Sequence, residues 1–123
     1  MEFNNNQPIY LQIVNKIKEE FVNGTRLPGE KMPSVREFSK VLKVNPTTIQ
    51  RVYKELELEE LTYTKRGMGS FVTEDKEMFI KMKKDIADQL TMDFIEKMSH
   101  IGIDKEQLIK FVDDKLSKEE KND

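Results

Sequence analysis

The chain has 123 residues, of which 37% are hydrophobic and 36% are charged, a composition typical of a polar, soluble protein with a modest core. No stretch approaches the roughly 18 apolar residues of a membrane span, and the amide-rich beginning does not resemble a signal peptide, so we expect a cytoplasmic protein. The absence of cysteine and a single histidine, His100, exclude disulfides and multi-histidine metal centres, and we expect no metal or other cofactor.

The net charge of −2 conceals an uneven distribution along the chain. Residues 1–73 carry 11 basic and 9 acidic side chains, whereas residues 74–123 carry 10 lysines and 14 acidic side chains. A mildly basic first part and an acidic second part indicate two regions with separate roles.

The first predicted helix begins at Pro8, because proline is favoured at a first helical position. Apolar residues then recur every four positions and form one face of an amphipathic helix. This stripe consists of Ile9, Ile13, Ile17 and Phe21, widened by Tyr10, Val14 and Val22. Gly24 ends the helix, since glycine is common just past a helix end.

A loop over residues 25–33 contains two prolines and leaves room for one short extended piece near Lys31 and Met32. Ser34 and Glu37 then form a capping box, in which each side chain accepts a hydrogen bond from the other residue's backbone amide. The capping box opens a short helix with its apolar residues on one side. They are Val35, Phe38, Val41 and Leu42.

A third helix is predicted over residues 46–57, with Asn45 at the N-cap and Pro46 as the first helical residue. Its apolar stripe consists of Ile49, Val52, Tyr53 and Leu56. Its opposite face carries Thr47, Thr48, Gln50, Arg51 and Lys54. A helix with small polar residues at its start and no large apolar group pointing outward is suited to entering a DNA groove.

Residues 61–73 predict a β-hairpin, because two short β-prone runs flank a turn that contains glycine. The turn has the sequence Lys65-Arg66-Gly67-Met68-Gly69. It places two cations on a segment with little side-chain bulk, and its glycines allow the backbone to approach a phosphate or the minor groove.

Three helices followed by a basic hairpin is the element order of a winged helix-turn-helix, which we expect over residues 1–73. In this motif helix 46–57 recognises base edges in the major groove, and wing 61–73 lies at the phosphates or the minor groove. The preceding helix crosses the DNA backbone, so its basic residues and those of the loop are candidate phosphate contacts. The expected DNA-binding residues are Lys31, Arg36, Lys43, Asn45, Thr47, Thr48, Gln50, Arg51, Lys54, Lys65, Arg66, Gly67 and Gly69.

Several ordered blocks resemble the GntR family of bacterial transcription regulators, and most of all its YtrA subfamily. The blocks are Pro8–Ile13, Leu27–Arg36, Val44–Leu56 and Arg66–Val72. The resemblance implies a dimeric DNA-binding regulator, most often a repressor. It also implies DNA contact by Arg36, by the polar positions of helix 46–57 and by the two glycines at the tip of the wing.

The chain departs from the family pattern at several positions that bear on the operator. Gln50 stands where many relatives have arginine, and glutamine suits adenine whereas arginine favours guanine. Thr47 replaces a common asparagine, Met68 a common basic residue, and Glu60 a usual glycine before the first wing strand. The operator sequence of relatives is therefore not transferable.

The remaining residues, 74–123, predict a helical dimerisation tail. A helix is expected from about residue 75 to residue 98, followed by a shorter one that Asp104 and Gln107 cap, with a frayed, charged end from residue 117. Two such helices cannot cover both of their apolar stripes, so we expect a second copy to do so. The expected interface residues are Phe79, Met82, Ile86, Leu90, Phe94, Leu108, Phe111 and Val112. Whether a small-molecule effector binds there stays open.

Two other classes of function compete with the DNA-binding reading. A winged helix can serve as a protein–protein interaction module, but apolar residues on the exposed face of the third helix or acids in the wing would then be expected. An enzyme using Asp113 and Asp114 is disfavoured, because adjacent residues on a helix diverge by about 100° and do not converge on one substrate. We therefore expect no enzymatic activity.

Overall fold

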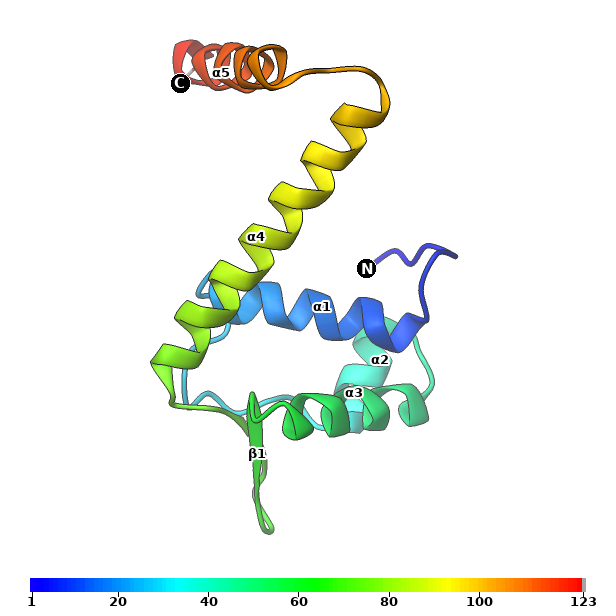
Figure 1. The fold of residues 1–123 in the computed structure, drawn as a ribbon. Coiled ribbons are helices and arrows are strands. Elements are labelled where there is room, and N and C mark those ends of the chain that lie inside the picture. Colours follow the sequence, from blue (N-terminus) through cyan, green and yellow to red (C-terminus); the bar gives the residue numbers. More distant parts are fainter. Residues whose placement is uncertain (123) are drawn as a thin grey trace. The chain divides into compact units, whose positions relative to one another are not determined.

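A computed structural model describes residues 1–122 as five helices and a two-stranded antiparallel hairpin, which confirms the predicted fold class (Figure 1). The elements are α1 Ile9–Val22, α2 Val35–Leu42, α3 Pro46–Leu58, β1 Thr62–Lys65, β2 Gly69–Val72, α4 Lys76–His100 and α5 Lys105–Asn122. Asp123, the last residue of the expected tail, lies outside the described residues. Within residues 1–122, the helices are all too short or too polar to cross a bilayer.

The chain divides into two units, Met1–Met82 and the segment from Lys83 onward. The first unit contains a shared hydrophobic core built from α1, α2, α3, the hairpin and the beginning of α4. The predicted stripes supply most of it, since Ile13, Ile17, Ile49 and Leu56 are almost completely buried. The periodicity of the sequence therefore identifies the inner faces of α1 and α3 correctly.

Two apolar residues of the predicted stripes of α1 and α2 are exposed. Ile9 lies in the first turn of α1 with 45% of its surface exposed, and Val41 in the last turn of α2 is 75% exposed. Both stand at a helix end, where the neighbouring elements leave them partly or largely uncovered. Helical spacing alone predicts which way a side chain points, and the length of the covering partner decides whether it is buried.

The hairpin is joined by a third extended segment that the loop before α2 provides. Thr62 pairs with Val72 and Lys65 with Gly69, which sets the register of β1 and β2. Lys31 forms a bridge with Phe71, and the Met32 amide donates to the Ser70 carbonyl at 2.8 Å. The short extended piece expected near Lys31 and Met32 is thus present, and it fixes the base of the hairpin.

The first two turns of α4 belong to the first unit. Phe79 is buried in its core, where its ring lies 5.7 Å from that of Phe21, and Met82 is half-buried against the same cluster. The first unit therefore extends to Met82, whereas the boundary expected from the sequence lies after residue 73.

The second unit consists of the rest of α4, a turn at Gly102 and α5. Asp104 and Gln107 form the expected capping pair, with the Gln107 amide donating to Asp104 Oδ1 at 2.9 Å and the Asp104 amide to Gln107 Oε1 at 3.1 Å. The expectation of a frayed end from residue 117 is wrong for the described residues, because α5 continues to Asn122.

Candidate nucleic-acid interface

The exposed face of α3 is polar because its local sequence orients the helix. Asn45 caps the helix, its Oδ1 accepting from the Thr47 amide at 2.9 Å, and Pro46 occupies the first turn. Ile49, Val52 and Leu56 have no exposed surface and anchor the opposite side. Thr47, Gln50, Arg51 and Lys54 face solvent, with Thr48 half-buried. Leu58, at the end of α3, is also 69% exposed, so the expectation that no large apolar group points outward is wrong for the last turn.

The turn between α2 and α3 is short and rigid. The Ser34–Glu37 capping box that begins α2 is present in both directions. Lys43 ends α2 in the left-handed conformation, with φ of 57°, and the Val44 amide donates to the Ser39 carbonyl. Only residues 43–45 separate the two helices, so α3 is presented at a fixed angle to α2.

A partly buried hydrogen bond joins α3 to the segment just before α2. The Tyr53 hydroxyl donates to the Pro33 carbonyl at 2.6 Å. Burial raises the pKa of the Tyr53 hydroxyl, which keeps it protonated as a donor. Because Arg36 lies in the first turn of α2, this bond also sets the position of its exposed side chain relative to α3.

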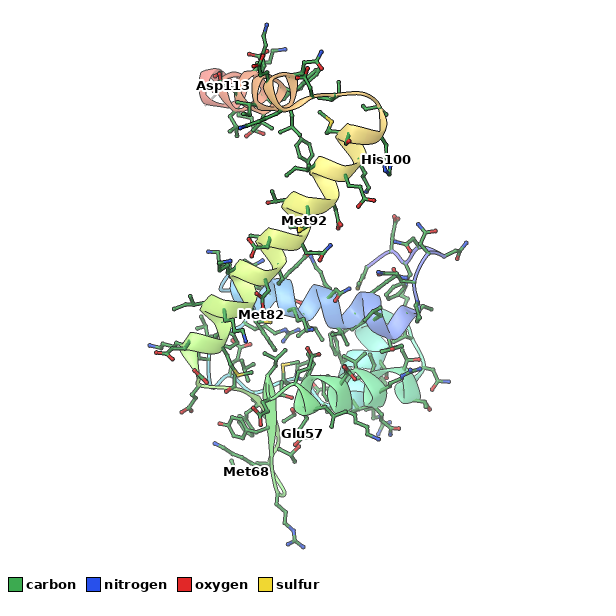
Figure 2. The ribbon with its side chains drawn as sticks, in the orientation of Figure 1. Glu57, Met68, Met82, Met92, His100 and Asp113 are labelled. Atoms are coloured by element: carbon green, nitrogen blue, oxygen red, sulfur yellow. The ribbon has the colours of Figure 1, made fainter. Side chains whose placement is uncertain are left out.

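The hairpin carries a group of cations at its exposed end. The Met68 amide donates to the Lys65 carbonyl across the turn, and Gly67 has a φ of 78°, which a side chain would strain. Lys65 Nζ lies 4.5 Å from the centre of the Phe71 ring. Lys31 runs beside Gly69, since a Cβ added there would lie 3.4 Å from Lys31 Cε. Figure 2 shows Met68 on this projecting hairpin.

The expected DNA-binding residues thus fall into three groups within the first unit. Thr47, Thr48, Gln50, Arg51 and Lys54 share the outer side of α3, with Asn45 at its start. Lys31, Lys65, Arg66, Gly67 and Gly69 lie on the hairpin and the segment bridged to it. Arg36 and Lys43 lie at opposite ends of α2. The capping bond already occupies the side-chain oxygen of Asn45, which leaves its amide group as the free donor.

Tyr10 lies beside the polar surface of α3, which the sequence does not predict. The Tyr10 ring in the first turn of α1 lies under Arg51, with Arg51 Cζ 3.7 Å from the ring centre. The helical spacing placed Tyr10 on the edge of the apolar stripe of α1. A large amphipathic residue at the edge of such a stripe, where the helix begins, is the signal that marks it as half-exposed.

The residues expected at a dimer interface divide between the two units. Phe79 and Met82 pack within the first unit, so the side of Phe79 is already covered inside one chain. The other residues lie in the second unit, where Leu90 is 65% and Phe111 51% exposed. Ile86 and Leu108 are half-buried, and Phe94 and Val112 are exposed.

The model of the family described as "Bacterial regulatory proteins, gntR family" matches residues 9–72, from α1 to the end of β2. The chain is 39% identical over 108 residues to the HTH-type transcriptional regulator YhcF of Bacillus subtilis, covering 88% of this chain and 89% of that protein. It is 34% identical over 106 residues to the HTH-type transcriptional repressor YtrA of the same organism, covering 85% and 82%. Both alignments extend beyond the winged helix into the tail.

Solved structures of transcription regulators are also similar to this chain. A GntR family transcriptional regulator from Listeria monocytogenes has a TM-score of 0.85 and 51% identity, covering 91% of this chain and 98% of that one. The structure of AraR(DBD) in complex with operator ORR3 has a TM-score of 0.53 and 27% identity, covering 59% and 88%.

Proposed function

The chain belongs to the GntR family of bacterial regulatory proteins, and from this we propose that it is a DNA-binding transcription regulator acting as a dimeric repressor. The proposal rests on one observation above all: the exposed side of the first half of α3 carries the polar residues Thr47, Gln50 and Arg51, and a cationic hairpin belongs to the same unit. Its structural neighbour AraR(DBD) is bound to an operator, which supports the same role here. Since bacterial DNA lies in the cytoplasm, that is where we place its action, without a catalytic role.

We assign α3 to base recognition. Thr47, Thr48, Gln50 and Arg51 lie in its first half, the part of a recognition helix that reaches base edges in the major groove. Gln50 is suited to the paired donor and acceptor of adenine. No acidic side chain lies in the first half of α3 to repel the DNA.

The remaining basic positions serve the phosphates. Arg36, Lys43 and Lys54 lie on α2, at its end and on α3, and Lys31, Lys65 and Arg66 belong to the wing. Contacts of this kind are independent of sequence and release condensed counterions, so they control affinity and its salt dependence. Gly67 and Gly69 have positive φ, a conformation that favours glycine, and their lack of side chains lets the backbone of the wing approach the DNA.

We propose that residues 1–73 bind DNA and that residues 74–123 form the dimer, with Phe79 joining the two parts. The exposed apolar residues of the second unit support this, because a second copy supplies the surface that one chain lacks. Two recognition helices in successive major grooves lie about 34 Å apart, so the operator is an inverted repeat. A small molecule that repacks the tail would change this separation and release the DNA.

Selection of bound fragments from the source genome by the purified full chain tests the proposal. The expected result is one enriched inverted repeat, a dimer by sedimentation equilibrium, and a steep loss of affinity with salt. The protein–protein alternative predicts no enriched sequence. A monomer that shows no preference among random oligonucleotides at moderate ionic strength contradicts the proposal.

A further inference from the structure

We propose that Tyr10 is a positioning residue for operator recognition: its ring holds the Arg51 guanidinium flat, so that Arg51 recognises one guanine in each half-site. The inference rests on the proposed function and adds to it an element outside the helix-turn-helix, since Tyr10 belongs to α1.

The contact lies where α1 and α3 meet. These two helices pack against each other, with their first turns at the same end of the unit (Figure 1). A cavity of about 340 Å³ opens between these turns and is lined by Pro8, Ile9, Tyr10, Thr47, Thr48 and Arg51. Tyr10 therefore contacts the part of α3 that carries the residues assigned to base recognition.

The Tyr10 ring is itself held in place. It is half-buried and packs against the hydrophobic core of the first unit. Arg51 Cζ lies 3.7 Å from its centroid, which is the distance of a guanidinium plane stacked on an aromatic face. The long, flexible side chain of Arg51 is thereby restricted to a small set of orientations before it meets DNA.

Stacking leaves the hydrogen-bonding edge of the guanidinium free. Its N–H donors point outward in the plane of the group, and within residues 1–122 Arg51 takes part in no hydrogen bond or ion pair. A guanine presents O6 and N7 side by side in the major groove, which matches two parallel donors. The geometry thus prepares Arg51 for guanine.

Arg26 shows the contrast within the same unit. Its Nε lies 3.5 Å from Glu20 Oε2, and its guanidinium also lies over the Phe38 ring. A carboxylate partner neutralises the cation and competes with any acceptor on DNA, whereas an aromatic face orients the cation and leaves its charge available. We therefore assign Arg26 a role in holding the fold. Arg51 is oriented by the Tyr10 ring and keeps its N–H donors available for DNA.

The test uses the operator selected by the wild-type full chain, together with its single-base-pair variants. Tyr10→Leu keeps apolar bulk against the core and removes the aromatic face. We expect it to reduce discrimination at one guanine roughly tenfold, within the range of a bidentate contact, with an unchanged salt slope. Tyr10→Phe should behave as wild type, because the ring is retained. Ile9→Ala, which removes apolar surface from the same cavity and leaves the Tyr10 ring in place, is the matched control.

A double-mutant cycle connects the two residues. In an Arg51→Ala background, Tyr10→Leu should have no further effect at that base pair. If Tyr10→Leu destabilises the fold, phenylalanines carrying increasing numbers of ring fluorines at position 10 keep the shape and weaken the attraction for the cation. Guanine discrimination should then fall stepwise with fluorination.

Three results would overturn the inference. Equal loss in Tyr10→Phe and Tyr10→Leu would make the hydroxyl the active group. A uniform loss on all sequences with a smaller salt slope would make Arg51 a phosphate contact. Unchanged discrimination in Tyr10→Leu would remove any positioning role. Failure of the wild-type chain to select an operator is a separate outcome that contradicts the proposed function itself.

Discussion

The two units of the chain use their apolar residues in opposite ways. In the described residues, the buried hydrophobic side chains all lie between Ile13 and Phe79, within the first unit. The second unit has large apolar residues as well, but Leu90, Phe94 and Phe111 are exposed. Fully burying a leucine or phenylalanine contributes about 1.5–3 kcal/mol, so the first unit has this stabilisation within one chain and the second unit does not.

This difference separates recognition from assembly. The shape of the DNA-facing surface is set by an intramolecular core, and it is complete in one chain. The tail exposes apolar surface to solvent, and we have proposed that a second copy of the chain covers it. Substitutions in the two units should therefore affect different measurements.

The largest expected effect comes from breaking the proposed dimer. Leu90→Asp with Phe94→Asp places two charges on the apolar stripe of α4 without disturbing the core of the first unit. We expect a monomer by sedimentation and a loss of operator affinity of roughly a hundredfold or more, because two linked half-site contacts become independent. Met92→Asp, an equally exposed apolar residue on the opposite side of α4, is the control and should remain dimeric. A double variant that stays dimeric would contradict the interface.

A core substitution tests the other half of the comparison. Leu56→Ala removes a completely buried side chain of α3 and should lower the free energy of unfolding by about 2–5 kcal/mol. Leu58→Ala, two residues further along the same helix and 69% exposed, should change it by about 0.5 kcal/mol or less. Chemical denaturation followed by circular dichroism measures both. Similar losses would show that Leu58 is buried between two copies of the chain, which would contradict a dimer formed by the tail alone.

Substituting Gln50 should weaken base recognition without lowering the folding stability of the chain. Gln50→Ala is expected to weaken operator binding by roughly 1–3 kcal/mol per protomer and to relax preference at one base pair. Gln89→Ala removes the same side chain from an exposed position in the second unit and should leave binding unchanged. Titration of the operator and its single-base variants distinguishes the two. A uniform decrease across all variants would assign Gln50 to the backbone instead.

The wing should act through charge. Lys65→Ala and Arg66→Ala are each expected to weaken binding to all sequences and to lower the slope of log affinity against log salt by about one unit. Lys84→Ala, an exposed lysine of the tail that pairs with Asp88, should leave the slope unchanged. If neither wing variant alters the slope, the wing does not contact the phosphates.

The smallest expected effect concerns backbone strain in the first unit. Glu60 has a φ of 62°, in the left-handed region that glycine tolerates best. Glu60→Gly should therefore raise the free energy of unfolding by about 1 kcal/mol. Glu57→Gly, inside α3, should lower it by a similar amount, because glycine weakens a helix interior. Thermal unfolding of the two variants should shift in opposite directions.

Local sequence signals predicted most of the elements and the main recognition surface. The capping pairs Ser34–Glu37 and Asp104–Gln107 are both formed, and the polar outer face of α3 follows from the spacing of its apolar residues. These features depend on residues within four positions of each other, so they are visible in a single sequence.

The misses involve contacts between distant segments. Ile9 and Val41 belong to the predicted apolar stripes but are exposed at the helix ends, and Phe79 packs on Phe21, 58 residues earlier in the chain. The Tyr10–Arg51 stack joins α1 to α3 in the same way. No local pattern specifies which helix lies against which.

The amino-acid sequence alone determined the helices, the hairpin, the family resemblance and the side of α3 that faces outward, because periodicity, capping and turn chemistry act over short distances. Only the tertiary structure decided that α4 contributes to the core of the first unit and that an aromatic ring of α1 lies beneath an arginine of α3. Those facts depend on how distant segments pack, and packing is a property of the folded chain as a whole.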